Sequence, residues 1–87
     1  MNEEEAIRLA KNAIQLLEDP TLDQAFKSIE EHYTDTWRRS KPSEYELREE
    51  CHAQLWSLFQ LRRQLQSFFE TGKILSSSSA DGERLKN

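Results

Sequence analysis

The chain has 87 residues, 16 of them acidic and 12 basic, and carries a net charge of −4. A chain of this size forms one domain with a modest core, which often needs oligomerisation to be stable. The acidic balance argues against a partner with many phosphates, so we do not expect nucleic-acid binding. A single cysteine excludes an internal disulfide and fits a reducing compartment. With neither a signal-peptide pattern nor a run of 18 apolar residues, the sequence predicts a soluble, cytoplasmic protein, which assembly can carry into a larger particle.

The first predicted helix covers residues 3–18. Asn2 and Glu5 form a start signal, and the acidic first turn suits the positive end of a helix dipole. Its apolar stripe is narrow and partly alanine, which favours close packing: Ile7, Ala10, Ala13, Ile14 and Leu17.

A second helix is predicted over residues 20–39. Asp19 can cap it and Pro20 fits its first position. Its stripe consists of Leu22, Phe26, Ile29, Tyr33 and Trp37. The short turn at residues 40–42 makes this helix and the next an antiparallel hairpin.

The third helix is predicted over residues 44–71. Ser43 and Glu46 form a capping box, and Gly72 followed by Lys73 is a stop signal. Its stripe is Leu47, Cys51, Leu55, Leu58, Leu65 and Phe69, interrupted only by Arg62. The sequence therefore predicts an all-α fold, in which the N-terminal helix packs on a long hairpin. Residues 1–75 form the single domain, and the Ser-rich residues 76–87 form a disordered tail.

The apolar face of the third helix is wider than one neighbouring helix can cover. Trp56 and Phe59 lie to one side of its stripe, with Leu61 and Phe68 on the other side. Its end reaches past the second helix, so that end must pack on the first helix or on another molecule. We expect self-association into a dimer or higher oligomer through Trp56, Phe59, Leu65, Phe68 and Phe69.

One pattern could hold a metal. Glu49 and His52 share a helical face at the spacing found in di-iron bundles, and Glu30 or Glu31 would add a ligand from the second helix. This would make the chain a ferritin-like metal-binding hairpin. Because Glu49 and His52 flank the apolar stripe and occur only once, a solvated face is the preferred interpretation, with no metal or cofactor.

No catalytic centre emerges from the pattern, so we predict a protein that is not an enzyme. Cys51, with His52 or His32 as its base, could be a nucleophile. Adjacent helical residues point about 100° apart, however, and a cysteine on a core stripe is usually a buried apolar side chain. Four aromatic residues predicted near the turn could cap the core or bind a partner: Tyr33, Trp37, Tyr45 and Trp56.

Three segments carry a resemblance. They are DPTLDQAFKSIEEHYTDTW (residues 19–37), LREE (47–50) and LxxQLQSFFETGKI (61–74). With these motifs, residues 8–75 resemble a family of small proteins encoded in tailed-bacteriophage genomes, near genes for terminase, portal and head proteins. The motifs are helix boundaries and core positions, so the resemblance implies the fold and carries over no catalytic residue.

The resemblance implies a structural, assembly or packaging accessory protein, which would act on a protein partner through helix–helix contacts. Two alternatives remain. One is an inhibitor of a host protein, of the anti-defence type, which would use the acidic helix faces of residues 30–50 as a decoy surface. The other is the metal-binding hairpin.

Overall fold

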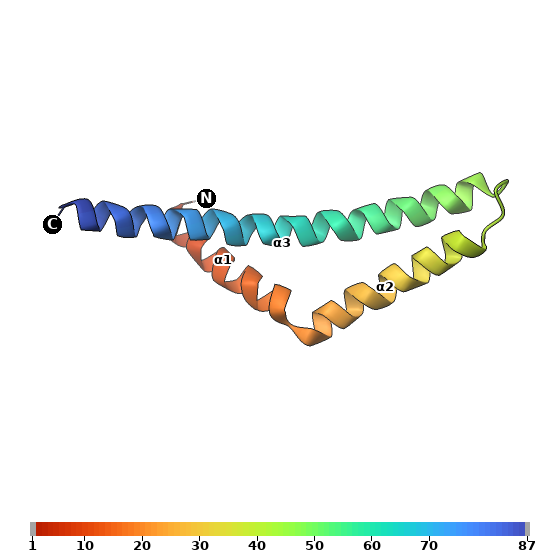
Figure 1. Cartoon of the computed structure of the whole chain (residues 1–87), viewed down its shortest axis with the longest axis horizontal. Coiled ribbons are helices and arrows are strands. Elements are labelled where there is room, and N and C mark those ends of the chain that lie inside the picture. The colour runs from red at the N-terminus through yellow and green to blue at the C-terminus, as the bar shows by residue number, and fades with distance from the viewer. Residues whose placement is uncertain (1, 87) are drawn as a thin grey trace. The chain divides into compact units, whose positions relative to one another are not determined.

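The protein consists of three α-helices: α1 (Glu3–Glu18), α2 (Pro20–Arg39) and α3 (Tyr45–Lys86). The structure, a computed structural model shown in Figure 1, describes residues 2–86, and their side chains as far as residue 77. Within that range there is no strand, so the predicted all-α fold is confirmed. The chain divides into two compact units. Unit 1 comprises Met1–Glu18 and Arg63–Asn87, unit 2 comprises Asp19–Arg62, and α3 contributes to both.

The first two helices begin where the sequence predicts. The side chain of Asn2 accepts a hydrogen bond of 2.8 Å from the Glu5 backbone N–H. The Asp19 carboxylate accepts two, from Thr21 N–H at 2.8 Å and from Leu22 N–H at 3.0 Å. These bonds satisfy N–H groups that have no partner inside the helix. The caps therefore determine both starts.

The start of α3 differs from the prediction. The Glu44 carboxylate accepts a 2.7 Å hydrogen bond from the Lys41 N–H, and the Glu44 N–H donates to the Lys41 carbonyl at 2.9 Å. This closed turn delays the helix to Tyr45. Among residues 2–77 no hydrogen bond joins Ser43 and Glu46, so the predicted capping box does not form. The glutamate whose side chain accepts from a preceding backbone N–H is Glu44 instead.

Unit 1 pairs α1 with the second part of α3 through small side chains. Ala6, Ala10 and Ala13 are buried, and Gly72 lies opposite Ala6 and Ala10. A methyl group added to Gly72 would overlap the Ala10 side chain and would lie 3.1 Å from the Ala6 carbonyl oxygen. The two backbones therefore approach closely. The prediction that the N-terminal helix packs on the third helix is confirmed.

The predicted end of α3 is wrong, since the helix continues through Gly72 to Lys86. No described glycine has the positive φ of a C-cap. Gly72 gives α1 room to approach, and a helix that is already nucleated propagates through serines at low cost. The predicted disordered tail thus overlaps backbone that is helical as far as residue 86. Residue 87, and the side chains of residues 78–86, lie outside the described part.

Unit 2 is the predicted antiparallel hairpin, in which α2 doubles back on the first part of α3 through a short turn (Figure 1). Phe26 and Cys51 are its buried apolar side chains. Arg62, which interrupts the predicted stripe, places its guanidinium carbon 4.8 Å from the centre of the Phe26 ring. Its Nη1 lies 3.6 Å from Oε1 of Glu30. The long Arg62 side chain therefore covers the Phe26 ring, while its charge is paired with that of Glu30.

The turn end of the hairpin is closed by a second arginine. The Arg48 guanidinium lies 4.5 Å from the centre of the Trp37 ring, and its Nη1 donates to the Ser40 hydroxyl at 3.1 Å. Cation–π contacts of this kind contribute roughly 0.5–1 kcal/mol at exposed sites. Together with the contact between Arg62 and Phe26, this one sets the register between α2 and α3.

Few side chains in the described part of the chain are buried. The buried apolar residues number five: Ala6, Ala10, Ala13, Phe26 and Cys51. The large apolar residues left exposed are Leu16, Ile29, Trp37, Tyr45, Trp56, Phe59, Leu61 and Ile74. A helical protein with so much exposed apolar surface has faces available for partners.

Candidate protein-binding surfaces

The structure does not bring the four metal candidates together. Glu49 and His52 line a hollow at the turn end of unit 2, together with Trp37, Tyr45 and Arg48. Glu30 and Glu31 line a different hollow on α2. Across the described residues, no group of three or more potential ligands is arranged to hold a metal ion.

The separation follows from the register of the hairpin. The sequence places Glu30 or Glu31 near the level of His52, as if the helices paired symmetrically about residues 40–42. In the structure His52 lines a hollow with Trp37, while Glu30 pairs with Arg62. The acidic residues of α2 thus lie about two helical turns from His52 along the hairpin.

The cysteine and the histidines also occupy different places. Cys51 is only 1% exposed, so no substrate can reach its sulfur. His52 is exposed at the turn end, whereas His32 packs edge to face against Tyr33 at 5.0 Å between ring centres. Within the described residues these three side chains are therefore not arranged as a nucleophile with an adjacent general base.

The four aromatic residues predicted near the turn separate. Trp37 and Tyr45 line the turn-end hollow, and Tyr45 is 73% exposed. Tyr33 lines a groove between α2 and α3, and Trp56 stacks on Phe59. Only the first two thus share a surface at the turn.

Trp56 and Phe59 form an aromatic pair on the surface of unit 2. Their ring centres lie 5.5 Å apart with planes 31° from parallel. Trp56 is 53% exposed and Phe59 48% exposed. Because neighbouring turns of one helix hold both residues, the two rings form a single apolar surface.

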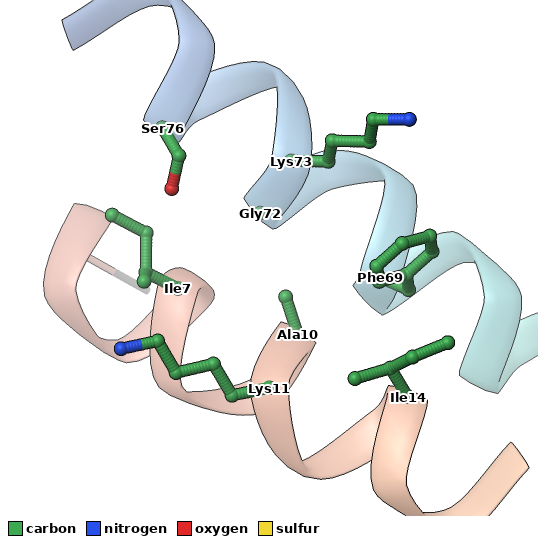
Figure 2. A pocket seen from close by; sticks show the side chains of 8 residues that line it. All are labelled: Ile7, Ala10, Lys11, Ile14, Phe69, Gly72, Lys73 and Ser76. Carbon is green, nitrogen blue, oxygen red and sulfur yellow. The ribbon is translucent and has the colours of Figure 1, made fainter. Parts of the chain in front are cut away.

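The other three predicted interface residues belong to unit 1. Leu65, Phe68 and Phe69 are half-buried there. Phe69 faces Ile14 of α1 across a hollow of about 180 Å³, shown in Figure 2. Ala10 and Gly72 lie at its middle, and the Lys73 ammonium points away from α1. The prediction of one continuous surface through all five residues stays untested, because the five are divided between the two units.

Sequence reasoning missed a groove between α2 and α3. This neutral groove of about 500 Å³ is lined by Ser28, Ile29, His32, Tyr33, Gln54, Ser57, Leu58 and Leu61. None of the eight is Asp, Glu, Lys or Arg. The signal in the sequence was that Ile29 and Tyr33 of the predicted α2 stripe are each preceded by an uncharged polar residue, Ser28 and His32, which lies on the adjacent part of the helix surface.

The charges of unit 2 gather on other faces of the hairpin. Lys27 pairs with Asp23 at 2.9 Å, and this hydrogen bond, with the attraction of the carboxylate charge, raises the pKa of Lys27 above 10.5. Another hollow is lined by Glu30, Glu31, Thr34, Asp35 and Arg38. Two of its three carboxylates are paired, Glu30 with Arg62 at 3.6 Å and Asp35 with Arg38 at 3.8 Å. The predicted decoy surface is therefore partly neutralised.

In comparisons with known proteins, no family model, curated protein or solved structure matches the chain. The resemblance to small phage proteins stays a prediction. Among the described residues no helix is both long enough and apolar enough to cross a membrane.

Proposed function

We propose that this chain is a non-enzymatic structural or assembly accessory protein of the tailed-phage type, which binds another protein through helix–helix contacts. The observation that carries the proposal is the aromatic pair, Trp56 and Phe59, each with about half of its surface exposed. The phage context rests on the sequence resemblance alone.

The physical argument concerns the cost and the gain of binding. The hot spots of protein interfaces are enriched in aromatic residues such as tryptophan, and truncating a hot-spot residue costs about 2 kcal/mol or more of binding free energy. Trp56 and Phe59 already stack on one helix, so little side-chain freedom is lost when a partner covers them. A partner helix laid across α3 would bury both rings.

The test is co-expression of the tagged chain with the head, portal and terminase proteins of the phage that encodes it. The variant Trp56→Glu/Phe59→Glu removes both rings and adds two negative charges. Thr21→Glu/Gln24→Glu is the matched control, because it adds the same charge at exposed positions of α2 in unit 2, away from the two rings.

We expect one of these proteins to co-purify at a fixed ratio with the wild type and with the control, and to be lost from the aromatic variant. Circular dichroism should show unchanged helix content in all three chains. If the aromatic variant retains its partner, or none of these proteins co-purifies, the proposal is wrong.

A further inference from the structure

We propose that the neutral groove of unit 2 binds a second copy of this chain, so that two α2–α3 hairpins form a four-helix bundle. This interface goes beyond the proposed function, because it lies on another face of α3 and has a different partner from the aromatic pair.

The shape of the groove suits a copy of itself. Tyr33 and Leu58 are half-buried, while Ile29 of α2 and Leu61 of α3 are 41% and 52% exposed. Exposed apolar residues from two adjacent helices form ridges, which fit between the ridges of another helix pair. A two-fold interface needs such a self-complementary surface, since each copy contributes the same residues.

The charge of the chain narrows the choice of occupant. Two copies with a net charge of −4 repel each other, and burying unpaired charges costs several kcal/mol. The neutral groove avoids the second cost because none of its lining residues is acidic or basic. The contact itself therefore adds no pair of like charges to the long-range repulsion. A strongly charged partner would find no opposite charge there. The surface that fits best is equally neutral, and the same groove on a second copy provides it.

The polar residues of the groove can hydrogen-bond across such an interface. Ser28, His32, Gln54 and Ser57 carry side-chain donors and acceptors without a permanent charge. Ser57 already donates to the Ala53 carbonyl at 3.0 Å, and its oxygen can still accept. Polar groups beside apolar ridges are the usual anatomy of a protein interface.

The area is close to what a stable dimer needs. The 20 residues of α2 make a helix about 30 Å long, and two packed helices present a face about 20 Å wide. The groove, lined by residues 28–33 of α2 and 54–61 of α3, is the central part of that face. The whole face covers about 600 Å² in projection, against about 800 Å² of accessible surface per partner in a standard interface. Unit 2 also needs the burial, because Phe26 and Cys51 are its only buried apolar side chains among the described residues.

The dimer leaves the aromatic pair accessible. Phe59 and Leu61 are two residues apart, about 200° around the helix axis, so they lie on opposite sides of α3. A dimer would present two aromatic pairs, and a partner with repeated sites would bind it with higher avidity than it binds one chain.

The test measures mass by size exclusion with light scattering on the full chain over a wide range of concentration. One variant is Ile29→Glu/Leu61→Glu, a second is Ile29→Lys/Leu61→Lys, and the control is Trp56→Glu/Phe59→Glu. All the substituted side chains are more than 40% exposed, so each variant should fold, and circular dichroism checks that.

We expect the wild type and the control to have twice the 10.3 kDa mass of the chain, and each groove variant to be a folded monomer. An equimolar mixture of the two groove variants should recover the dimer, because opposite charges then face each other. A monomeric wild type would overturn the proposal. So would a dimer that only the control disrupts, or groove variants that remain dimers. A monomeric wild type, or groove variants that remain dimers, would leave the aromatic pair accessible to its partner, whereas a dimer that only the control disrupts would place the second copy on that pair. The outcomes therefore distinguish failure of this proposal from failure of the proposed function.

Discussion

Each unit pairs two antiparallel helical segments, but the two units bury different kinds of side chain. In unit 1 the buried residues of α1 are alanines, which face a glycine of α3. In unit 2 a phenylalanine and a cysteine are buried, and Arg62 covers the phenylalanine ring. Unit 1 therefore depends on the close approach of two backbones, and unit 2 on filling the space between helices with large side chains.

This difference determines which substitutions each unit tolerates. Where backbones nearly touch, an added methyl group has no room. Where a large ring fills the space, the damage comes from removing it. Enlarging a side chain at the contact should thus destabilise unit 1, whereas truncating the buried side chain should destabilise unit 2.

The largest effect is expected from Phe26→Ala in unit 2. Phe26 is only 6% exposed, so the truncation leaves a cavity and removes the surface on which Arg62 lies. We expect a loss of about 3–5 kcal/mol in the free energy of unfolding. Urea denaturation followed by circular dichroism measures it.

The matched control is Tyr45→Ala, an aromatic truncation in the same unit at a side chain that is 73% exposed. It should change the free energy of unfolding by less than about 0.5 kcal/mol. Equal losses in the two variants would show that unit 2 is not held by its buried ring.

The second effect is expected from Gly72→Ala in unit 1. Helix propensity alone favours alanine by about 1 kcal/mol. The new methyl group would overlap the Ala10 side chain, and overpacking costs about 1–3 kcal/mol, so we expect a net loss of up to about 2 kcal/mol. The same urea denaturation measures the change.

Two further variants sharpen this result. Ser67→Ala, at an exposed position in the same unit, raises helix propensity without touching α1 and should not destabilise the chain. In an Ala10→Gly background, Gly72→Ala should be less harmful by at least about 0.5 kcal/mol, because the opposing methyl group is gone. A Gly72→Ala chain more stable than the wild type would rule out the close approach.

The smallest effect concerns the charged surface of unit 2. The Asp23 carboxylate raises the pKa of Lys27, chiefly by its hydrogen bond and then by its charge. We expect Asp23→Asn to return the pKa of Lys27 towards 10.5, as followed by NMR titration, whereas Asp35→Asn should leave it unchanged. The reverse pattern would contradict the observed pairing.

The sign of the pH dependence follows from the raised pKa. The folded chain holds the Lys27 proton more tightly than the unfolded chain, so the pair stabilises the fold at pH values below 10.5. That contribution disappears as the pH rises through the folded-state pKa. Because both side chains are about half exposed, the effect on stability should be far smaller than that of Phe26→Ala.

The sequence predicted the parts of the fold that depend on neighbours in the chain. Asn2 and Asp19 cap their helices through residues two or three positions away, so a local pattern was enough. The apolar stripes likewise identified Phe26 and Cys51 as core residues. The candidate sites were harder, because the metal hypothesis needed the register between two helices, which the contacts of Arg48 and Arg62 set.

The sequence by itself determined three helices, two of their starts and the hairpin, since caps, periodicity and a short turn act over a few residues. Only the tertiary structure decided where α3 ends, how α2 and α3 align and which face stays neutral. Gly72 shows the physical reason. A glycine can end a helix or admit a neighbouring backbone, and the choice depends on Ala10, which is far away in the sequence and adjacent in the fold.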